Sequence, residues 1–153
     1  MIEKFLEDKV ITAIDSLGIE GLHVVGSWST PEEETAETAA ILAVVVGPRT
    51  YSRYTVCEAT FPVSLELVVS TAVDKDGELF LNAATAITNM LHVWNMNKHN
   101  EAKTALAVDG KLSIGGIRVE GGDAPFYDRD NARRSTSISF SVTGFVSHEL
   151  NNN

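Results

Sequence analysis

Two segments of the chain place their apolar residues at the spacing of a helix with one buried face. Residues 2–17 and 79–95 both repeat apolar side chains every three or four positions, which predicts two amphipathic helices. Gly18 follows the first segment, where a C-cap glycine is expected. The apolar positions are Ile2, Phe5, Leu6, Val10, Ala13, Ile14 and Leu17 in the first helix, and Phe80, Ala83, Ala84, Ile87, Leu91 and Trp94 in the second.

Other segments have the two-residue spacing of strands. Residues 61–70 and 135–146 alternate apolar side chains with mostly polar ones, as expected of strands with one buried face. The continuous β-branched run at 41–46 predicts a buried strand, and residues 22–28 predict a short one. Pro62 lies inside the first alternating run, so we expect that strand to be at a sheet edge or to begin there.

The segments between these elements are predicted connections. Residues 74–78 (DKDGE) form a turn, and residues 95–103 form a polar linker that leads to TALAV and then to KLSIGGIRVE. Residues 30–38 fit two descriptions equally well. They are either a short helix, capped by Thr30 with Pro31 at its first position and Glu33 completing a capping box, or a solvated acidic loop.

The order of helix, strands, helix and strands predicts an α+β domain. We expect a mainly antiparallel sheet with the two amphipathic helices packed on one face. The chain has no internal repeat and no break in composition, so residues 1–146 are predicted to be a single domain. Residues 147–153 are a polar tail that we expect to be disordered.

Composition narrows the function. The chain of 153 residues is 44% hydrophobic and 22% charged, as is usual for a soluble globular protein. Its net charge of −9 argues against a surface that binds nucleic-acid phosphates. The start, MIEKFLEDKV, is not expected to be a signal peptide, and the run AAILAVVVG is too short to cross a bilayer. We therefore expect synthesis in a reducing cytoplasm.

The sequence predicts no catalytic or metal site, and therefore no enzyme and no cofactor. Cys57 is the single cysteine, which excludes an intrachain disulfide and a thiolate zinc site, and we expect it to be a buried or half-buried small apolar residue. The four histidines, His23, His92, His99 and His148, lack carboxylates at ligand spacing and are expected at the surface. Asp74, Asp76 and Gly77 resemble half of a calcium loop, but a turn explains them better. The serines of residues 135–141 are expected to form the polar face of a sheet.

The stretch GGDAPFYDRDNARR, residues 121–134, is the strongest candidate for a contact surface. It offers aromatic anchors and arginines, the residue types that are enriched at protein interfaces. The candidate contact residues are Phe126, Tyr127, Arg129, Arg133 and Arg134. The alternative is a mobile, solvated hairpin extension.

The layout of the whole chain resembles that of a known family. An N-terminal amphipathic helix is followed by a Gly/Pro break, the strand FPVSLELVVSTA and the helix LNAATAITNMLHVW. The strand SIGGIRVEG, a charged loop and the closing strand STSISFSVTGFV complete the order. This pattern, over residues 2–146, is similar to the tail terminator (minor tail, or tail-completion) family of long-tailed bacteriophages. The acidic segment 30–38 and the polar tail lie outside the resemblance.

The resemblance implies a structural virion protein. Members of the family form hexameric rings that cap the tail tube, stop its polymerisation and join the tail to the head. The implied partners are other copies of the chain, the tail tube protein and head-tail connector proteins, with DNA passing through the channel without specific binding. No membrane and no cofactor are implied, and the implied location is the tail or neck of the virion.

In such a ring, the arginines of residues 121–134 are expected to reach acidic residues of a neighbouring subunit, such as Glu32, Glu33 or Glu34. Two alternatives remain open. One is another phage neck, connector or tail-tube-related ring subunit, and the other is a small cytosolic ligand-binding α+β domain of the ferredoxin-like type.

Overall fold

The protein is described here by a computed structural model that covers residues 1–27, 40–52, 57–96 and 100–147. Its helices are α1 (Ile2–Asp15), α2 (Glu78–Met96) and α3 (Asn100–Leu106). Its strands are β1 (Leu22–Gly26), β2 (Ala40–Val46), β3 (Thr50–Tyr51), β4 (Glu58–Ser70), β5 (Leu112–Gly122), β6 (Phe126–Asp128) and β7 (Arg133–Val146).

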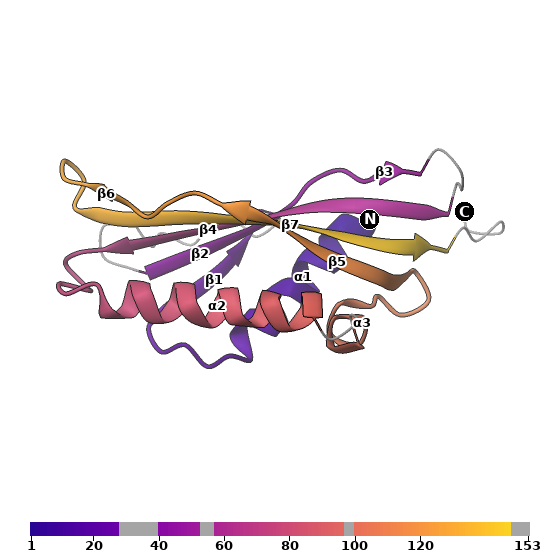
Figure 1. The fold of residues 1–153 in the computed structure, drawn as a ribbon, viewed down its shortest axis with the longest axis horizontal. Coiled ribbons are helices and arrows are strands. Elements are labelled where there is room, and N and C mark those ends of the chain that lie inside the picture. Colours follow the sequence, from indigo (N-terminus) through magenta and orange to yellow (C-terminus); the bar gives the residue numbers. More distant parts are fainter. Residues whose placement is uncertain (28–39, 53–56, 97–99, 148–153) are drawn as a thin grey trace.

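The strands form one long sheet in the order β1-β2-β4-β7-β5 (Figure 1). β1 and β2 are parallel, and every other described pairing is antiparallel. The longest ladder joins β4 to β7 and pairs Glu58 with Phe145 at one end and Ser70 with Arg133 at the other. Short strands extend the sheet at both ends, because β3 pairs with β4 beyond β2 and β6 pairs with β7 beyond β5.

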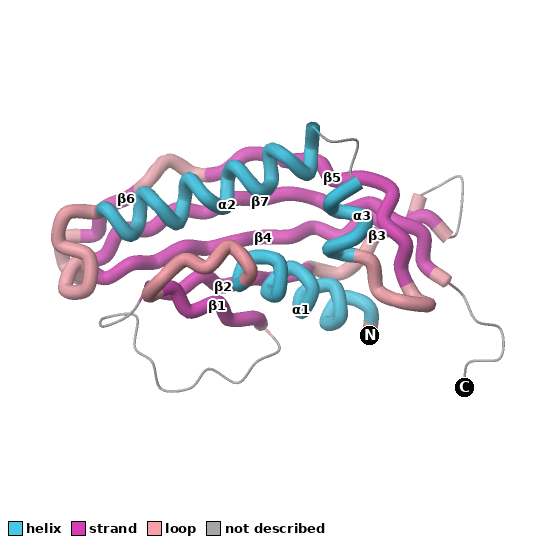
Figure 2. The backbone as a smooth tube through the Cα atoms, turned by 90° about the horizontal axis from the view of Figure 1, so that it is seen from below, coloured by secondary structure: helices cyan, strands magenta, loops and turns pink. Residues whose placement is uncertain are grey.

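The helices lie on one face of this sheet, and no other described element covers the second face, which we call the open face (Figures 1 and 2). α1 packs on β1 and β2, whereas α2 packs on β4 and β5. The core between the layers uses the alternating side chains that the sequence indicates, such as Phe61, Leu65 and Phe140, all almost fully buried. Trp94 of α2 meets Phe140 edge-on, with ring centroids 6.4 Å apart. The predicted α+β class, with helices on one face of a mainly antiparallel sheet, is confirmed.

A third helix occupies part of the segment predicted to be a polar linker. α3 buries Ala102 and Leu106, each with no exposed surface, against β5 and α1. These two residues are four positions apart and therefore share one face of a helix. The element is only seven residues long. Two buried apolar residues among polar neighbours are too few to show a helical period in the sequence.

The prediction for Pro62 was wrong in placing it at a strand start or at the edge of the sheet. β4 is a central strand, and Pro62 lies well inside it, opposite Ser141 of β7. On its other side β2 has already ended at Val46 and β3 has not begun, and the carbonyl of Pro62 accepts a hydrogen bond from the Gly47 amide at 2.8 Å. The position that lacks an N–H therefore falls at a break in the neighbouring strand, where no ladder bond is lost.

Candidate protein-protein interface

Most of the stretch 121–134 is a β-hairpin. β5 ends at Gly122, the chain continues in the same direction along β7 as β6, and it then turns back into β7, whose start pairs with β6 in the register Phe126–Ser135, Tyr127–Arg134 and Asp128–Arg133. Asp123 fastens the irregular segment between β5 and β6, because its carboxylate accepts a hydrogen bond from the Ser137 hydroxyl at 2.8 Å. A charged loop was predicted, and the structure shows a paired extension of the sheet.

The turn of this hairpin is organised by Asp128. Its carboxylate accepts hydrogen bonds from the Asn131 side-chain amide at 2.8 Å and from the backbone amide of Asp130 at 3.1 Å. The side-chain hydrogen bond from Asn131 is the main reason that the pKa of Asp128 lies below its ordinary value. The turn ends at Ala132, whose φ of 52° is in the left-handed region.

Arg134 connects the hairpin to the turn between β4 and α2. Its guanidinium donates to the carbonyl of Asp74 at 2.8 Å and to the carbonyl of Lys75 at 3.3 Å, and it lies 3.9 Å from the Asp74 carboxylate. It also lies over the ring of Tyr127, 5.7 Å from the centroid. In the isolated chain Arg134 is thus engaged in holding the hairpin in place.

The hairpin presents its aromatic side chains to solvent. Phe126 is 62% exposed and Tyr127 is 50% exposed, and Arg129 is exposed in the turn. Arg133 is half-buried at the start of β7. The predicted partners Glu32, Glu33 and Glu34 lie outside the described residues, so their pairing with these arginines stays a prediction.

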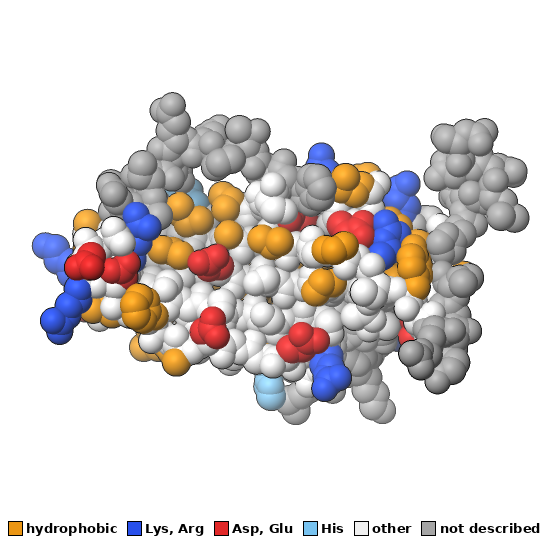
Figure 3. Space-filling view, turned by 90° about the horizontal axis from the view of Figure 1, so that it is seen from above, with side chains coloured by type: hydrophobic (Ala, Val, Ile, Leu, Met, Phe, Trp, Pro, Cys, Tyr) orange, Lys and Arg blue, Asp and Glu red, His pale blue; other side chains and the backbone are white. Residues whose placement is uncertain are grey.

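The open face of the sheet carries the small polar side chains expected from the sequence. Ser135, Ser137 and Ser139 of β7 lie on this face, with Ser64 and Glu66 of β4 beside them. Figure 3 views this face, on which apolar side chains follow one side of the molecule and acidic ones are scattered. The apolar group on β1, β2 and β4 consists of Val25, Ile41, Ala43, Val45 and Val68.

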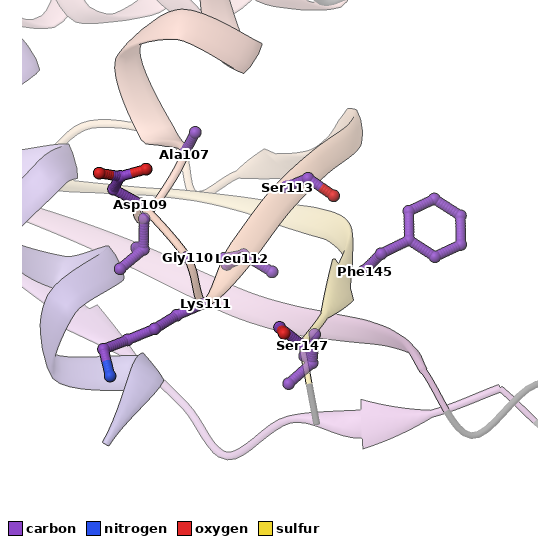
Figure 4. A pocket seen from close by; sticks show the side chains of 10 residues that line it. Ala107, Asp109, Gly110, Lys111, Leu112, Ser113, Phe145 and Ser147 are labelled. Atoms are coloured by element: carbon purple, nitrogen blue, oxygen red, sulfur yellow. The ribbon is translucent and has the colours of Figure 1, made fainter. Parts of the chain in front are cut away.

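A shallow cavity of about 450 Å³ lies at the other end of the molecule, between the α3–β5 connection and the end of β7. Its lining combines apolar side chains with Asp109 and Lys111, which point away from each other (Figure 4). The ammonium group of Lys111 lies 5.6 Å from the ring centroid of Phe5. The cavity thus lacks the convergent polar groups that bind and orient a small substrate.

The residues considered for chemistry are placed apart from one another. His23 of β1 and His92 of α2 are both exposed, and His99 and His148 lie outside the described residues. Cys57 is exposed, which corrects the expectation that it is buried or half-buried, because it precedes β4 and is not part of the strand. No group of three or more His, Cys, Asp or Glu within the described part of the chain is arranged to hold a metal ion.

The half-motif of a calcium loop has a different role, the capping of α2. The buried carboxylate of Asp74 accepts hydrogen bonds from the amides of Leu79 at 3.1 Å and Phe80 at 2.9 Å, and Asp76 accepts one from Glu78 at 3.1 Å. These amides have no partner within the helix, so the two aspartates satisfy the helix start.

Two acidic residues of α1 were missed by the sequence analysis. Glu7 is 1% exposed and accepts hydrogen bonds from the Ser27 hydroxyl at 2.6 Å and the Val46 amide at 3.4 Å. Glu3 forms a two-bond ion pair with Arg49, at 2.8 and 2.9 Å. The signal was present, because both glutamates share the helical stripe of Val10 and Ile14 at intervals of three and four residues.

Comparisons with known proteins show that this chain shares its fold with a solved structure, without a match in sequence. The sequence matches no protein-family model, and it matches no curated protein. In structure, the chain is similar to one from the virion of a native gene transfer agent particle, with a TM-score of 0.50, 12% identity, and coverage of 92% of this chain and 91% of the other. These values show a shared fold.

A second similar structure is the sheath/tube terminator, in the extended state, of PVC, an extracellular contractile injection system. The TM-score is 0.40 and the identity 15%, over 93% of this chain and 56% of the other, which is too low to support a conclusion about this chain. Among the described residues, no helix combines the length and the apolar character needed to cross a membrane.

Proposed function

We propose that the protein is a ring-forming tail terminator of a phage or phage-like particle. The ring caps the tail tube, stops its polymerisation and joins the tail to the head. The subunits form a ring that is expected to be a hexamer, the ring contacts the tail tube protein and head-tail connector proteins, and DNA passes through its channel. The protein acts without a cofactor and resides in the tail or neck of the virion.

The observation that carries this proposal is the fold similarity to a chain of a gene transfer agent virion. It extends over nearly the whole of both chains, so it concerns the complete arrangement of helices and sheet. The sequence pattern independently resembles that of tail terminators. A fold hosts many functions, so the proposal also rests on the surface of this chain.

The surface is that of an assembly subunit. The hairpin holds two exposed aromatic side chains on a rigid support, an arrangement typical of interface anchors. The net charge of −9 gives the subunits little attraction for phosphates, as is suitable for a channel through which DNA slides. In the ring, we expect the hairpin to contact the adjacent subunit.

The test is the oligomeric state of the purified protein. Size-exclusion chromatography with light scattering is expected to show a closed ring, formed alone or on addition of the tail tube protein, and tube growth is expected to stop when the ring is added. A strictly monomeric protein that leaves tube growth unchanged would refute the proposal. Immunogold labelling of virions separates a terminator, at the head-proximal end of the tube, from another neck protein.

The contribution of the hairpin is tested with Phe126→Ser and Tyr127→Ser together, and separately with Arg129→Glu. Arg129 is preferred to Arg134 because Arg134 makes hydrogen bonds within the chain. Ring formation is expected to weaken in both variants. Phe145→Ser, at the opposite end of β7 and 49% exposed, is the matched control. Equal assembly of all the variants would exclude the hairpin as a contact.

A further inference from the structure

The two long helices cover the same face of the sheet, yet they differ sharply in charge. In α1, six of the fourteen residues are Asp, Glu or Lys, as is usual for a helix with one solvated face. In α2, Glu78 at the first position is the only such residue among nineteen. In a chain that is 22% charged, about four would be expected.

The uncharged residues of α2 include those that point away from the sheet. Leu81 is 64% exposed and Val93 is 38% exposed, and Thr85, Thr88 and His92 are exposed between them. Leu81, Thr85, Thr88 and His92 follow one another at three- and four-residue intervals, and with Val93 beside His92 they define the outer face of α2. A hollow of about 220 Å³ lies on this face, lined by Ala84, Thr85, Thr88 and Asn89. Depletion of charge is the compositional mark of the buried centre of an interface.

We infer that the outer face of α2 binds a second copy of this chain. The distribution of charge favours a second copy as the binding partner. A basic protein or a cation would be attracted to the acidic parts of the surface and not to the neutral helix α2. Two copies that each carry −9 repel one another, so they associate best where at least one of the two surfaces carries no acid, as on the outer face of α2. The inference rests on the proposed function and specifies which surfaces meet in the ring.

The surface that fits it on the second copy is the apolar group of the open sheet face, which we call the β1–β2 patch. It consists of Val25, Ile41, Ala43, Val45 and Val68. Val45 is 42% exposed, and a hollow of about 230 Å³, lined in part by Val45 and Pro62, adjoins it. The outer face of α2 is neutral, and the patch is apolar with Glu66 opposite Ala43 and Glu120 at the adjoining hollow. A helix packs readily on such a sheet face.

The positions of the two surfaces determine how copies are related. α2 lies over β4 and β5 on the helical face, whereas the β1–β2 patch lies toward the other edge of the sheet on the open face. The surfaces are thus at opposite corners of the molecule. Each copy offers α2 to one neighbour and the patch to the other, which is the head-to-tail contact that closes into a ring by rotation.

The direct test is cross-linking with a short bis-maleimide, in a Cys57→Ser background that removes the exposed native thiol. A chain that carries both Thr85→Cys and Val45→Cys is expected to give a ladder of oligomers up to the closed ring. Either cysteine alone is expected to give none. Thr12→Cys on α1 combined with Val45→Cys is the matched control, also without a ladder. Dimers from Thr85→Cys alone, or an equal ladder from the control, would overturn the inference.

A second measurement uses charge. Thr85→Glu with Thr88→Glu places two carboxylates on the outer face of α2, and Thr12→Glu with Thr104→Glu places them on exposed positions of α1 and α3. Both variants carry the same net charge. The α2 variant is expected to raise the dissociation constant for self-association at least about tenfold, while its circular dichroism and melting temperature stay near those of the control.

The outcomes separate the inference from the proposed function. If the wild type forms rings and the α2 variant forms them equally well, the α2 contact is wrong and the ring stands. If the wild type stays monomeric in the presence of the tail tube protein, both are wrong. Loss of tube binding by the α2 variant with its ring intact would assign the outer face of α2 to the tube protein, and would overturn the inference.

Discussion

Two glutamates on the inner side of α1 show how single residues join the helix to the sheet. Glu3 binds the guanidinium of Arg49, and Arg49 in turn lies 5.7 Å from the ring centroid of Phe61. Glu7 fills the space beside Gly26, where an added Cβ would stand 2.5 Å from its carboxylate oxygen. Any larger residue at Gly26 therefore pushes the acid out of its site. The contact between α1 and the sheet thus combines the apolar packing of Leu6, Val10 and Ile14 with two tightly fitted polar contacts.

Replacing Arg49 with Met is expected to lower the free energy of unfolding by about 1 kcal/mol at neutral pH, since a partly buried carboxylate loses a two-bond partner that is itself partly solvated. Burial acts to raise the pKa of Glu3, but the hydrogen bonds from Arg49 and the backbone outweigh it, so the pKa lies below the ordinary 4.5. A carboxylate whose pKa is lowered in the folded state contributes its full stabilisation at a pH above its pKa in the unfolded chain. This contribution is lost as the pH falls through the pKa of the folded state.

The difference between the wild type and Arg49→Met is thus expected to shrink in urea titrations as the pH falls below 4.5. Glu3→Gln serves as the control, because the double variant should lose little more than either single one. A difference that stays constant down to low pH would show that Arg49 acts through its packing on Phe61 alone.

The hairpin turn contains a strained residue that can be relieved. Ala132 adopts a φ of 52°, which costs an L-residue about 1 kcal/mol, and glycine removes this cost. Ala132→Gly is therefore expected to raise the melting temperature slightly, although glycine also loosens the unfolded chain. Gly77→Ala is the reciprocal change at a φ of +80° beside the Arg134 guanidinium, and it should destabilise. In scanning calorimetry, shifts of the same sign would contradict one of the two predictions, and a reversal of both signs would contradict both.

At the scale of elements, the sequence predicts the long helices and strands whose apolar residues recur at a regular spacing. The alternation of β4 and β7 and the stripes of α1 and α2 were sufficient to identify four main elements and their common core. α3 and β6 were missed because they are short and depend on contacts made far along the chain. Pro62 was misplaced for the same reason, since the break between β2 and β3 is a property of the assembled sheet.

The sequence predicted only part of the candidate interface. The residue types of the hairpin pointed to a contact surface, but the sequence does not show that Arg134 is held by the carbonyls of Asp74 and Lys75, sixty residues away in the chain. The charge-free face of α2 was visible in the sequence. It became informative only when the structure placed α1 and α2 on the same face, where their difference in charge needs an explanation.

The start of α2 depends on one buried carboxylate. Asp74→Ala removes the acceptor for two helix amides and a neighbour of Arg134, and we expect a loss of about 2 kcal/mol in the free energy of unfolding. Asp76→Ala removes a single exposed hydrogen bond and should cost about 0.5 kcal/mol. Urea denaturation of both variants measures the contrast. Equal losses would mean that the buried cap contributes no more than the exposed one.

At the scale of the whole molecule, shape and charge act together. The molecule is long and thin, with a face covered by helices, an open face and a hairpin at one end (Figure 1). The proposed ring brings such acidic subunits side by side, so long-range repulsion opposes assembly while apolar contacts favour it. The balance between these two effects depends on salt.

Raising NaCl from about 50 to about 500 mM is expected to increase the fraction of ring, because salt screens the repulsion between acidic subunits and leaves the uncharged α2 contact intact. Sedimentation velocity over the series measures the effect. The opposite result, a ring that dissociates as salt rises, would show that pairs between the hairpin arginines and acids of the neighbour dominate the interface.

The pairing of β4 with β7 also bears on when the chain could enter the proposed ring. β7 follows every other described element in the sequence, yet it lies inside the sheet, between β4 and β5, and pairs with residues of β4 that precede it by more than sixty positions. Contacts so distant in the chain form slowly. Until β7 pairs with β4, β5 has no strand with which to pair. α2, which packs on both β4 and β5, then lacks the part of its packing surface that β5 supplies. The α2 side of the proposed contact is therefore fully supported only in a completely folded chain, so we expect a chain still on the ribosome to be unable to join the proposed ring.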